Sequence, residues 1–402
     1  MKRFNLRVLL ILSLGHLAVD IYQGALPAVL PFLKDRFGLS YAMTGLILMA
    51  SNFTSSILQP VFGYVSDRKA MAFLLPLGLL AAGIGFSLLA YSPYFLLILG
   101  LVIVSGLGVA SFHPEGYKTA HFFTGERAAT GMSFFSVGGN LGFSLGPIIS
   151  LYIVNYYGFS ALPVIVVPAL LCTALIVINK KTIMVPVEDH ERMIKQDSSK
   201  IPAMAYVSLG MVILIVVMRS WAQIGLVTYI PFYYIDYLKG SPLFAGKLVF
   251  TFLFCGAVGT LIGAPIADRC GHRLFIRLSM LLSTITLPTI FIPAIQNGAL
   301  LFVALGLQGM LLVSTFSVTI VMAQRLLPSK LGIASGLMVG FAIGTGGIGV
   351  TVLGFVADHF GVPAALYSIA VLPCAGFLLS LILRYHDDKT TPYQYSRKTE
   401  RR

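Results

Sequence analysis

The chain alternates between long apolar segments and short polar stretches, a pattern that is typical of membrane proteins. The apolar segments are approximately 7–32, 43–65, 71–90, 94–118, 128–152, 160–179, 203–235, 244–266, 274–295, 298–326, 331–355 and 362–384. A helix needs about 20 apolar residues to cross the hydrocarbon core of a bilayer, and each segment is about that long. The pattern predicts an all-α membrane protein with twelve transmembrane helices.

Two phrases occur once in each half of the chain. Gly63-Tyr-Val-Ser-Asp67-Arg68 corresponds to Ala264-Pro-Ile-Ala-Asp268-Arg269, 201 residues later. Ala129-Thr-Gly131-Met corresponds to Ala334-Ser-Gly336-Leu, 205 residues later. Because six spans separate the copies, both copies have the same orientation in the membrane. Parallel repeats with a site at their interface are typical of transporters, and we therefore expect two pseudo-symmetric six-helix halves.

The polar stretches predict the domain organisation. We expect an N-terminal six-helix half at 1–179, a cytoplasmic linker at 180–201, a C-terminal six-helix half at 202–385 and a cytoplasmic tail at 386–402. The linker contains Glu188-Asp-His-Glu-Arg192 and is the most polar stretch before the tail.

Composition and charge agree with a membrane protein. Asp, Glu, Lys and Arg make up 11% of the chain, against roughly 25% in soluble domains, which excludes an ordinary soluble protein. The net charge of +13 would suit a nucleic-acid binder, but the positions of the charges oppose this. With both termini in the cytoplasm, cytoplasmic segments carry 23 of the 28 Lys and Arg residues and the opposite side carries four. This asymmetry follows the positive-inside rule, so we expect cytoplasmic termini, a surrounding lipid bilayer and no nucleic-acid partner; a monomer suffices for this architecture.

Ionisable residues within the spans are the candidates for function, because they are costly in lipid. His16 and Asp20 are four residues apart on the first helix and share a face. Asp20 lies roughly 20 Å into its span, at about 1.5 Å per residue. In the fourth span, Ser111-Phe-His113-Pro114-Glu115-Gly116 combines polar groups with a helix breaker. This phrase predicts a broken helix at a binding site.

A carboxyl group in a low-dielectric medium takes up a proton more readily than it does in water. We therefore expect proton coupling at Asp20, Glu115, His16 and His113, with Asp20 as the first choice of proton carrier and Glu115 as the second. The histidines either extend a proton path or hold the carboxylate. The alternative is a structural role, in which His16 and Asp20 fix the first helix against the fourth and part of the second motif terminates its helix.

Arg219 is the deep charge of the second half. It suits either neutralisation of a carboxylate or binding of an anion, and the residue pattern leaves both open. The expected substrate-binding residues are Arg219, Tyr22, Gln23, Phe112, Asn140, Trp221, Gln223 and Tyr229. For Asn140 the alternative is interhelical hydrogen bonding, and for Tyr229 it is a place in the aromatic belt at the membrane interface.

No cofactor is predicted. The four cysteines form no CxxC or CxxH spacing, so we expect no zinc or redox site at them. Gly344-Thr-Gly346-Gly347-Ile-Gly349 fits GxGxxG, but it lies within an apolar helix with no strand before it, which excludes a dinucleotide site. An alternative from another class is a membrane metalloenzyme, although the sequence lacks HExxH. Its metal ligands would be His16, Asp20, His113 and Glu115.

Glycines recur every four residues in two spans and so share one helix face in each. They are Gly332, Gly336, Gly340 and Gly344 in the eleventh span, and Gly138, Gly142 and Gly146, followed by Pro147, in the fifth. Small residues at this spacing let helix backbones approach closely in lipid. We expect helix packing through Gly142, Gly146, Pro147, Gly336, Gly340 and Gly344.

The phrase Gly63-x-x-x-Asp67-Arg68 resembles the loop signature of the major facilitator superfamily, and its twin is Ala264-x-x-x-Asp268-Arg269-x-Gly271-His-Arg273. In that family the acid and the base of this loop latch helices at the cytoplasmic gate. The first copy continues with Lys69-Ala-Met where the family favours Gly-Arg-Arg, which implies a weaker latch. The resemblance implies gating roles for Gly63, Asp67, Arg68, Asp268, Arg269 and Arg273.

Gly142-x-x-x-Gly146-Pro147 in the fifth span resembles the antiporter motif of drug–proton exchangers, although Ile148-Ile-Ser150 stands where that motif has a second glycine pair. A closer resemblance, across nearly all twelve spans, is to the fosmidomycin resistance protein family. It rests on Leu58-Gln-Pro-Val-Phe-Gly-Tyr64, Phe112-His-Pro-Glu115, Val137-Gly-Gly-Asn-Leu-Gly142, Ala323-Gln324 with Leu327-Pro328, and Gly346-Gly-Ile-Gly349.

This resemblance implies a proton-coupled transporter that exports small drugs by drug/proton antiport at the bacterial inner membrane. Its candidate substrate is an anionic phosphonate such as fosmidomycin. Many relatives carry an arginine in the fourth span; this chain lacks it, and Arg219 is expected to take part of its role. The alternative keeps the fold and changes the cargo to a natural anionic metabolite or a sugar phosphate, exported or imported.

Overall fold

The computed structural model describes residues 4–39, 41–68, 73–183, 201–240, 242–296, 298–342 and 344–385. Within these ranges the chain forms helices and no strand. Twelve helices are long and apolar enough to span a membrane, so the predicted all-α fold is confirmed. Most of the predicted linker, at 184–200, lies outside the described residues, as do the whole predicted tail and the phrase that begins at Lys69.

The first six spans are built from elements between residues 6 and 178, and some spans contain more than one element. These elements are α1 (Leu6–Phe37), α2 (Tyr41–Asn52), η1 (Phe53–Ile57), α3 (Gln59–Arg68), α4 (Leu74–Ser87), η2 (Leu88–Tyr91), α5 (Phe95–His121), α6 (Ala128–Tyr157), η3 (Phe159–Val166) and α7 (Val167–Ile178).

The last six spans follow the same plan. Their elements are α9 (Ala203–Phe232), η4 (Tyr233–Tyr237), α10 (Pro242–Cys270), α11 (His272–Thr286), η5 (Leu287–Phe291), α12 (Pro293–Gln296), α13 (Ala299–Val313), α14 (Thr315–Leu326), α15 (Leu331–Gly336), η6 (Leu337–Ala342), α16 (Gly346–Phe360), α17 (Val362–Ile369) and α18 (Val371–Ile382).

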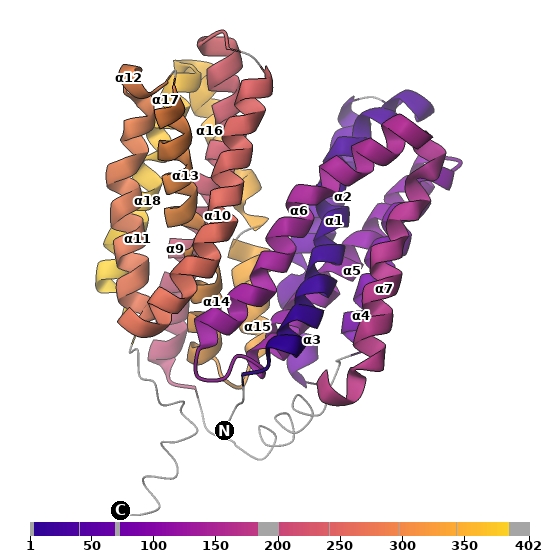
Figure 1. Ribbon diagram of the computed structural model, residues 1–402, viewed down its shortest axis with the longest axis horizontal. Coiled ribbons are helices and arrows are strands. Elements are labelled where there is room, and N and C mark those ends of the chain that lie inside the picture. The colour runs from indigo at the N-terminus through magenta and orange to yellow at the C-terminus, as the bar shows by residue number, and fades with distance from the viewer. Residues whose placement is uncertain are drawn as a thin grey trace, which may run out of the picture.

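The two sets of spans form two bundles that meet at one end of the molecule. Figure 1 shows the N-terminal half, from indigo to magenta, diverging from the C-terminal half toward the end opposite the chain termini. The halves contact each other through α3 and α5 against α15, and through α6 against α10 and α14. Most of the described Lys and Arg residues stand at the ends of spans on this side, and Lys34, Arg36, Lys239 and Lys247 stand at the opposite ends.

The expected break of the fourth span at Pro114 is wrong, because α5 runs without interruption from Phe95 to His121. Proline removes one backbone hydrogen bond, which leaves the carbonyl of Ala110 without its usual donor. Every side chain from Val109 to Ala120 is buried. Tertiary packing on all sides therefore keeps the segment helical despite the proline.

The irregular turns occur elsewhere, in three π-helical segments. These are η1 in the second span, η4 after the seventh and η6 in the eleventh. The segments η1 and η6 contact each other across the two halves. Single π-helical turns are frequent at functional positions in helical proteins.

The glycine stripe of the eleventh span lies against the second span of the other half. A Cβ atom at Gly336 would lie 2.7 Å from the backbone oxygen of Gln59, and one at Gly332 would lie 2.6 Å from that of Gly63. Gly340 faces the carbonyl of Ser56 in the same way. Glycine therefore permits the close approach of two backbones that belong to different halves.

The glycine stripe of the fifth span has a partner within its own half. Gly138, Gly142 and Gly146 lie against the backbone carbonyls of Ser13, Leu17 and Ile21 on α1. This close packing of α6 on α1 holds the polar residues of the first helix in the interior of the N-terminal half.

Candidate functional site

Three polar side chains of the N-terminal half form a compact buried cluster. His16 Nε2 lies 3.3 Å from Asp20 Oδ2, and His113 Nε2 lies 3.1 Å from Asp20 Oδ1. The two Nε2 atoms are 3.1 Å apart. All three residues are buried, and we call them the His–His–Asp cluster.

Backbone carbonyls fix the orientation of both imidazole rings. His16 Nδ1 is 2.9 Å from the carbonyl oxygen of Phe135, and His113 Nδ1 is 3.0 Å from that of Val109. A carbonyl oxygen can only accept a hydrogen bond, so each Nδ1 carries a hydrogen. Both Nε2 atoms are thereby directed at each other and at Asp20.

Packing between α1, α5 and α6 holds this geometry. The rings of His16 and Phe135 stack with centroids 4.4 Å apart. Phe112 packs against the His16 ring at 6.4 Å and against the His113 ring at 6.2 Å, between centroids. A Cβ atom at Gly139 would collide with His16 Nε2 and with the Asp20 carboxylate. Phe112, one of the expected substrate-binding residues, thus lies among the side chains that position the cluster.

Glu115 belongs to a second buried network, away from Asp20. Ser66 Oγ donates a hydrogen bond to Glu115 Oε2. Lys118 Nζ donates to the backbone oxygen of Ser66 at 2.8 Å and lies 3.8 Å from Glu115 Oε2. Lys118 was not among the predicted site residues, because it stands at the predicted end of the fourth span, 94–118. Its spacing of three residues from Glu115 was the signal for this ion pair.

The donor set of the His–His–Asp cluster is also one that metals accept. One ligand atom from each of its three residues lies within 4.8 Å of the other two, and imidazole with carboxylate suits zinc. Glu115 is not part of this group. The four-ligand site considered from the sequence is therefore reduced to three residues.

Arg219 is the largest fully buried side chain among the described residues, with 1% of its surface exposed. Its guanidinium carbon lies 5.3 Å from the ring centroid of Phe316. Its Nε and Nη1 atoms have no hydrogen-bond partner in the described part of the chain, and no described carboxylate lies within ion-pair distance. Neutralisation of a protein carboxylate, one of the two alternatives for this residue, thus finds no partner among the described residues.

Two of the expected substrate-binding residues make hydrogen bonds inside the N-terminal bundle. The Tyr22 hydroxyl donates to the carbonyl oxygen of Ile165 at 3.1 Å and accepts from the backbone nitrogen of Ala169 at 3.2 Å. Gln23 Nε2 donates to Ser55 Oγ at 3.4 Å. These contacts tie α1 to α7 and to η1.

Two more of the expected substrate-binding residues make hydrogen bonds within their own half. Trp221 Nε1 donates to Thr345 Oγ1 at 3.3 Å, and the Tyr229 hydroxyl donates to the carbonyl oxygen of Val350 at 2.9 Å, both within the C-terminal half. Gln223 is half-buried on the same helix. Asn140 differs from these, because its buried Nδ2 has no partner among the described residues.

The acids of the repeated loop motif join the two halves. Asp67 accepts hydrogen bonds from the backbone nitrogens of Gly332 and Ile333, each at 2.8 Å, at the start of α15. Asp268 accepts from the backbone nitrogens of Ala129 at 3.0 Å and Thr130 at 2.8 Å, at the start of α6. Each acid thus caps a helix of the opposite half, where a carboxylate is favoured by the helix dipole.

Two basic residues of the motif have described contacts inside their own halves. Arg68 stacks over the ring of Tyr64 at 4.2 Å. Arg273 Nη2 donates to the carbonyl oxygen of Leu381, at 3.1 Å, at the end of α18. Arg269 is exposed.

Gln324 makes a further contact between the halves; the sequence predicts interhelical hydrogen bonding for this residue but not which helix it reaches. Gln324 Oε1 lies 2.8 Å from His121 Nδ1, and Gln324 Nε2 donates to the carbonyl oxygen of Tyr117 at 3.1 Å. Gln324 also reaches Ser335 Oγ, at 3.0 Å, on the neighbouring α15. A glutamine in an apolar span is a weak signal by itself, because interhelical hydrogen bonds of this kind occur within halves as well as between them.

Comparison with known families decides the class of protein. The profile of the Major Facilitator Superfamily matches residues 12–246 and 212–402. The chain belongs to the major facilitator superfamily. It is therefore a multi-pass membrane transporter and not an enzyme, which overturns the metalloenzyme alternative.

Two bacterial relatives of this transporter extend over most of its length. It is 34% identical over 380 residues to the Bacillus subtilis (strain 168) protein named uncharacterized MFS-type transporter YfnC, covering 93% of this chain and 92% of that protein. It is 32% identical over 381 residues to the fosmidomycin resistance protein of Escherichia coli (strain K12), covering 94% of this chain and 92% of the relative.

Solved structures show the same fold. The proton:xylose symporter XylE matches with a TM-score of 0.71 at 14% identity, covering 96% of this chain and 97% of that one. The transporter FucP in the outward conformation matches with a TM-score of 0.67 at 17% identity, covering 94% and 99%. These two transporters share the fold of the present chain.

Proposed function

We propose that this transporter exports small anionic drugs, with fosmidomycin as the candidate substrate, in exchange for protons. The observation that carries the proposal is a pair of buried ionisable sites on opposite halves. The N-terminal half holds the His–His–Asp cluster, and the C-terminal half holds Arg219 without a counter-ion among the described residues. The relative named for fosmidomycin resistance supports the choice of substrate.

The geometry of the cluster supports a proton-binding role. Each Nδ1 donates to a backbone carbonyl, so two neutral imidazoles would direct two lone pairs at each other across 3.1 Å. A hydrogen bond at that distance requires a hydrogen on one Nε2. The cluster therefore suits one extra proton on the histidine pair, with the Asp20 carboxylate as its counter-ion.

Arg219 supports an anionic substrate. A guanidinium offers several N–H donors in a fixed plane and matches the oxygens of a phosphonate or phosphate. A natural organic phosphate could accept hydrogen bonds from the same donors. Arg219 therefore supports an anionic substrate but does not distinguish a phosphonate drug from a natural phosphate.

Exchange requires direct competition between the substrate and the proton. An anion close to the cluster would by itself attract a proton and favour co-transport. Antiport therefore needs a donor group of the substrate to occupy the Asp20 carboxylate, so that substrate and proton exclude each other. Phosphonate drugs that carry hydroxyl or amide donors meet this requirement.

The direction of transport follows from the topology in this proposal. The halves meet at the end that carries the basic loops, and that end faces the cytoplasm by the positive-inside rule. The arrangement is then the outward-facing one, in which protons enter the cluster from outside. Rocking of the two halves would expose the same sites to the cytoplasm.

Inside-out vesicles with an imposed proton gradient test this function. Addition of fosmidomycin should partly collapse the gradient in vesicles with the wild-type transporter, and Asp20→Asn should abolish the response while fosmidomycin still binds. Asp35→Asn is the matched control, because Asp35 is exposed near the C-terminal end of α1, away from the cluster. A stable gradient in wild-type vesicles that demonstrably contain folded transporter would contradict proton-coupled export of this drug.

A further inference from the structure

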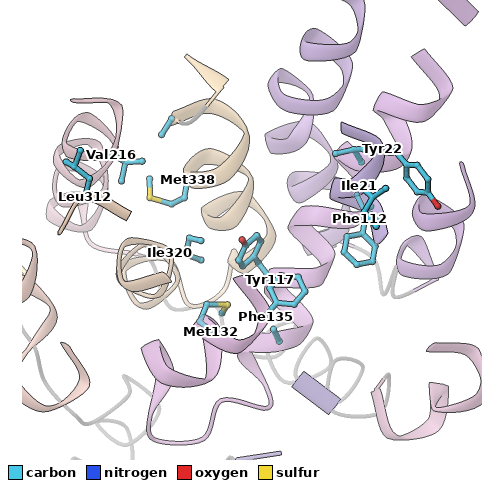
Figure 2. Close-up of a cluster of buried hydrophobic side chains, with 14 of the residues drawn as sticks. Ile21, Tyr22, Phe112, Tyr117, Met132, Phe135, Val216, Leu312, Ile320 and Met338 are labelled. Atoms are coloured by element: carbon cyan, nitrogen blue, oxygen red, sulfur yellow. The ribbon is translucent and has the colours of Figure 1, made fainter. Parts of the chain in front are cut away.

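Tyr117 lies at the junction of the two halves, next to the His–His–Asp cluster. Its ring centroid is 5.5 Å from that of His16 and 4.7 Å from that of Phe135, both in edge-to-face geometry. On its other side it meets Phe316 of α14, with ring centroids 6.5 Å apart. Figure 2 shows Tyr117 beside Phe135, with Ile320 of the C-terminal half across from it.

The hydroxyl of Tyr117 is buried and makes no hydrogen bond within the described part of the chain. The polar side chain that this hydroxyl faces within the N-terminal half is Ser136, whose own hydroxyl donates to the carbonyl oxygen of Met132 at 2.9 Å. A buried hydroxyl without a partner destabilises a protein. Such groups are rare in native proteins, and a functional role is one common reason for them.

Arg219 flanks the same phenylalanine from the C-terminal half. Its guanidinium carbon lies 5.3 Å from the Phe316 ring centroid, and the Tyr117 ring centroid lies 6.5 Å from that of the same phenylalanine. Unpartnered buried donors thus come from both halves. They are the Tyr117 hydroxyl on α5 and, within the described part of the chain, the Nε and Nη1 atoms of Arg219 on α9.

We infer that the Tyr117 hydroxyl is a second ligand of the anion that Arg219 binds. The chemistry fits a phosphonate or a phosphate monoester, whose terminal oxygens accept hydrogen bonds from several directions. The site is complete only when both halves contribute to it. This inference rests on the proposed function for the anionic cargo and adds the residue that recognises it from the N-terminal half.

The position of Tyr117 also connects the anion to the proton. Its ring packs edge-to-face against that of His16, with centroids 5.5 Å apart, so one aromatic ring separates an anion bound at its hydroxyl from the cluster. A substrate anchored there by its acidic group can extend its donor group to Asp20. Tyr117 is therefore a positioning residue for the competition that antiport requires.

The variant Tyr117→Phe isolates the hydroxyl, because phenylalanine keeps the ring contacts. Binding of radiolabelled fosmidomycin and of inorganic phosphate to the purified transporter should weaken by about ten-fold or more, as expected for a hydrogen bond to a charged group. The melting temperature should not fall, because the hydroxyl has no described partner to lose. The matched control is Tyr233→Phe, whose hydroxyl accepts a hydrogen bond from Gln296 Nε2 at 2.7 Å; it should lower the melting temperature and leave binding unchanged.

The outcomes separate this inference from the proposed function. Wild-type affinity for both probes in folded Tyr117→Phe would overturn the inference and leave the proposed function standing. If the wild type binds phosphate and not fosmidomycin, the proposed substrate fails, and the effect of Tyr117→Phe on phosphate still decides the inference. Absence of binding of either probe to the wild type would overturn both.

Discussion

Arg219 is a buried charge with no counter-ion among the described residues. A central arginine disfavours membrane insertion of a helix by about 2.5–3.5 kcal/mol on the biological scale. Its contact with the Phe316 ring offsets about 0.5–2 kcal/mol, and no described carboxylate offsets the remainder. A bound anion would supply the missing charge and hydrogen bonds, which is why we assign the substrate to this residue.

Replacement of Arg219 should change selectivity as well as affinity. Arg219→Gln keeps much of the side-chain length and removes the charge, so anionic substrates should bind about ten-fold or more weakly, while neutral compounds change little. Equilibrium binding to purified protein measures both. Arg277→Gln is the control, because Arg277 Nη2 donates to the carbonyl oxygen of Ser380 at the end of α18. Equal losses for anionic and neutral compounds would indicate a structural role instead.

Contacts between residues of one helix could be predicted from the sequence. His16 and Asp20 are four apart on α1, so their contact followed from helix geometry. The third member, His113, could be named but not placed, because its contact with Asp20 depends on the packing of α5 against α1. Glu115 is two residues further along α5 and belongs to another network. No local sequence pattern shows that His113 and Glu115 belong to different networks.

At the scale of elements, the contact between the second and eleventh spans sets how closely the halves approach. Gly332, Gly336, Gly340 and Gly344 extend over roughly 18 Å of helix at 1.5 Å per residue. The glycine spacing predicted a packing face, but it could not tell which helix would lie against it. The stripe in the fifth span has the same spacing and packs within its own half.

A methyl group at this contact should separate the halves. In Gly336→Ala the new Cβ would lie 2.7 Å from the backbone oxygen of Gln59, and overpacking of this kind destabilises the packed state by about 1–3 kcal/mol. Distances between spin labels at residues 126 and 329 should therefore shift toward longer values. Gly347→Ala is the control on the same span, because a Cβ there meets nothing within 4 Å. Unchanged distances in Gly336→Ala would show that the contact does not limit the closed arrangement.

The positions of the transmembrane helices were the most predictable feature of the fold, because each apolar segment must be long enough to cross the lipid core. The fifth span, expected at 128–152, is Ala128–Tyr157, and the seventh, expected at 203–235, is Ala203–Phe232. The helix at Pro114 was mispredicted, since burial on all sides overrides the local effect of proline. The π-helical segments η1 and η6 had no local signal and arise where the halves meet.

At the scale of the whole molecule, the sequence repeat explains why two acids make equivalent contacts between the halves. Asp67 caps α15 and Asp268 caps α6, so the same acid performs the same task from each half. The polar sites do not repeat in this way. The N-terminal half holds the His–His–Asp cluster and the C-terminal half holds Arg219, so in the proposed function the proton and the anion bind to different halves of a symmetric scaffold.

In the proposed function, substrate and proton compete at the His–His–Asp cluster. The most direct test is the proton balance on binding, measured with a pH-indicator dye when fosmidomycin is added to purified transporter in weakly buffered solution. We predict release of a proton from the wild type and none from Asp20→Asn. Proton uptake by the wild type, or binding without any change in protons, would contradict antiport at this cluster.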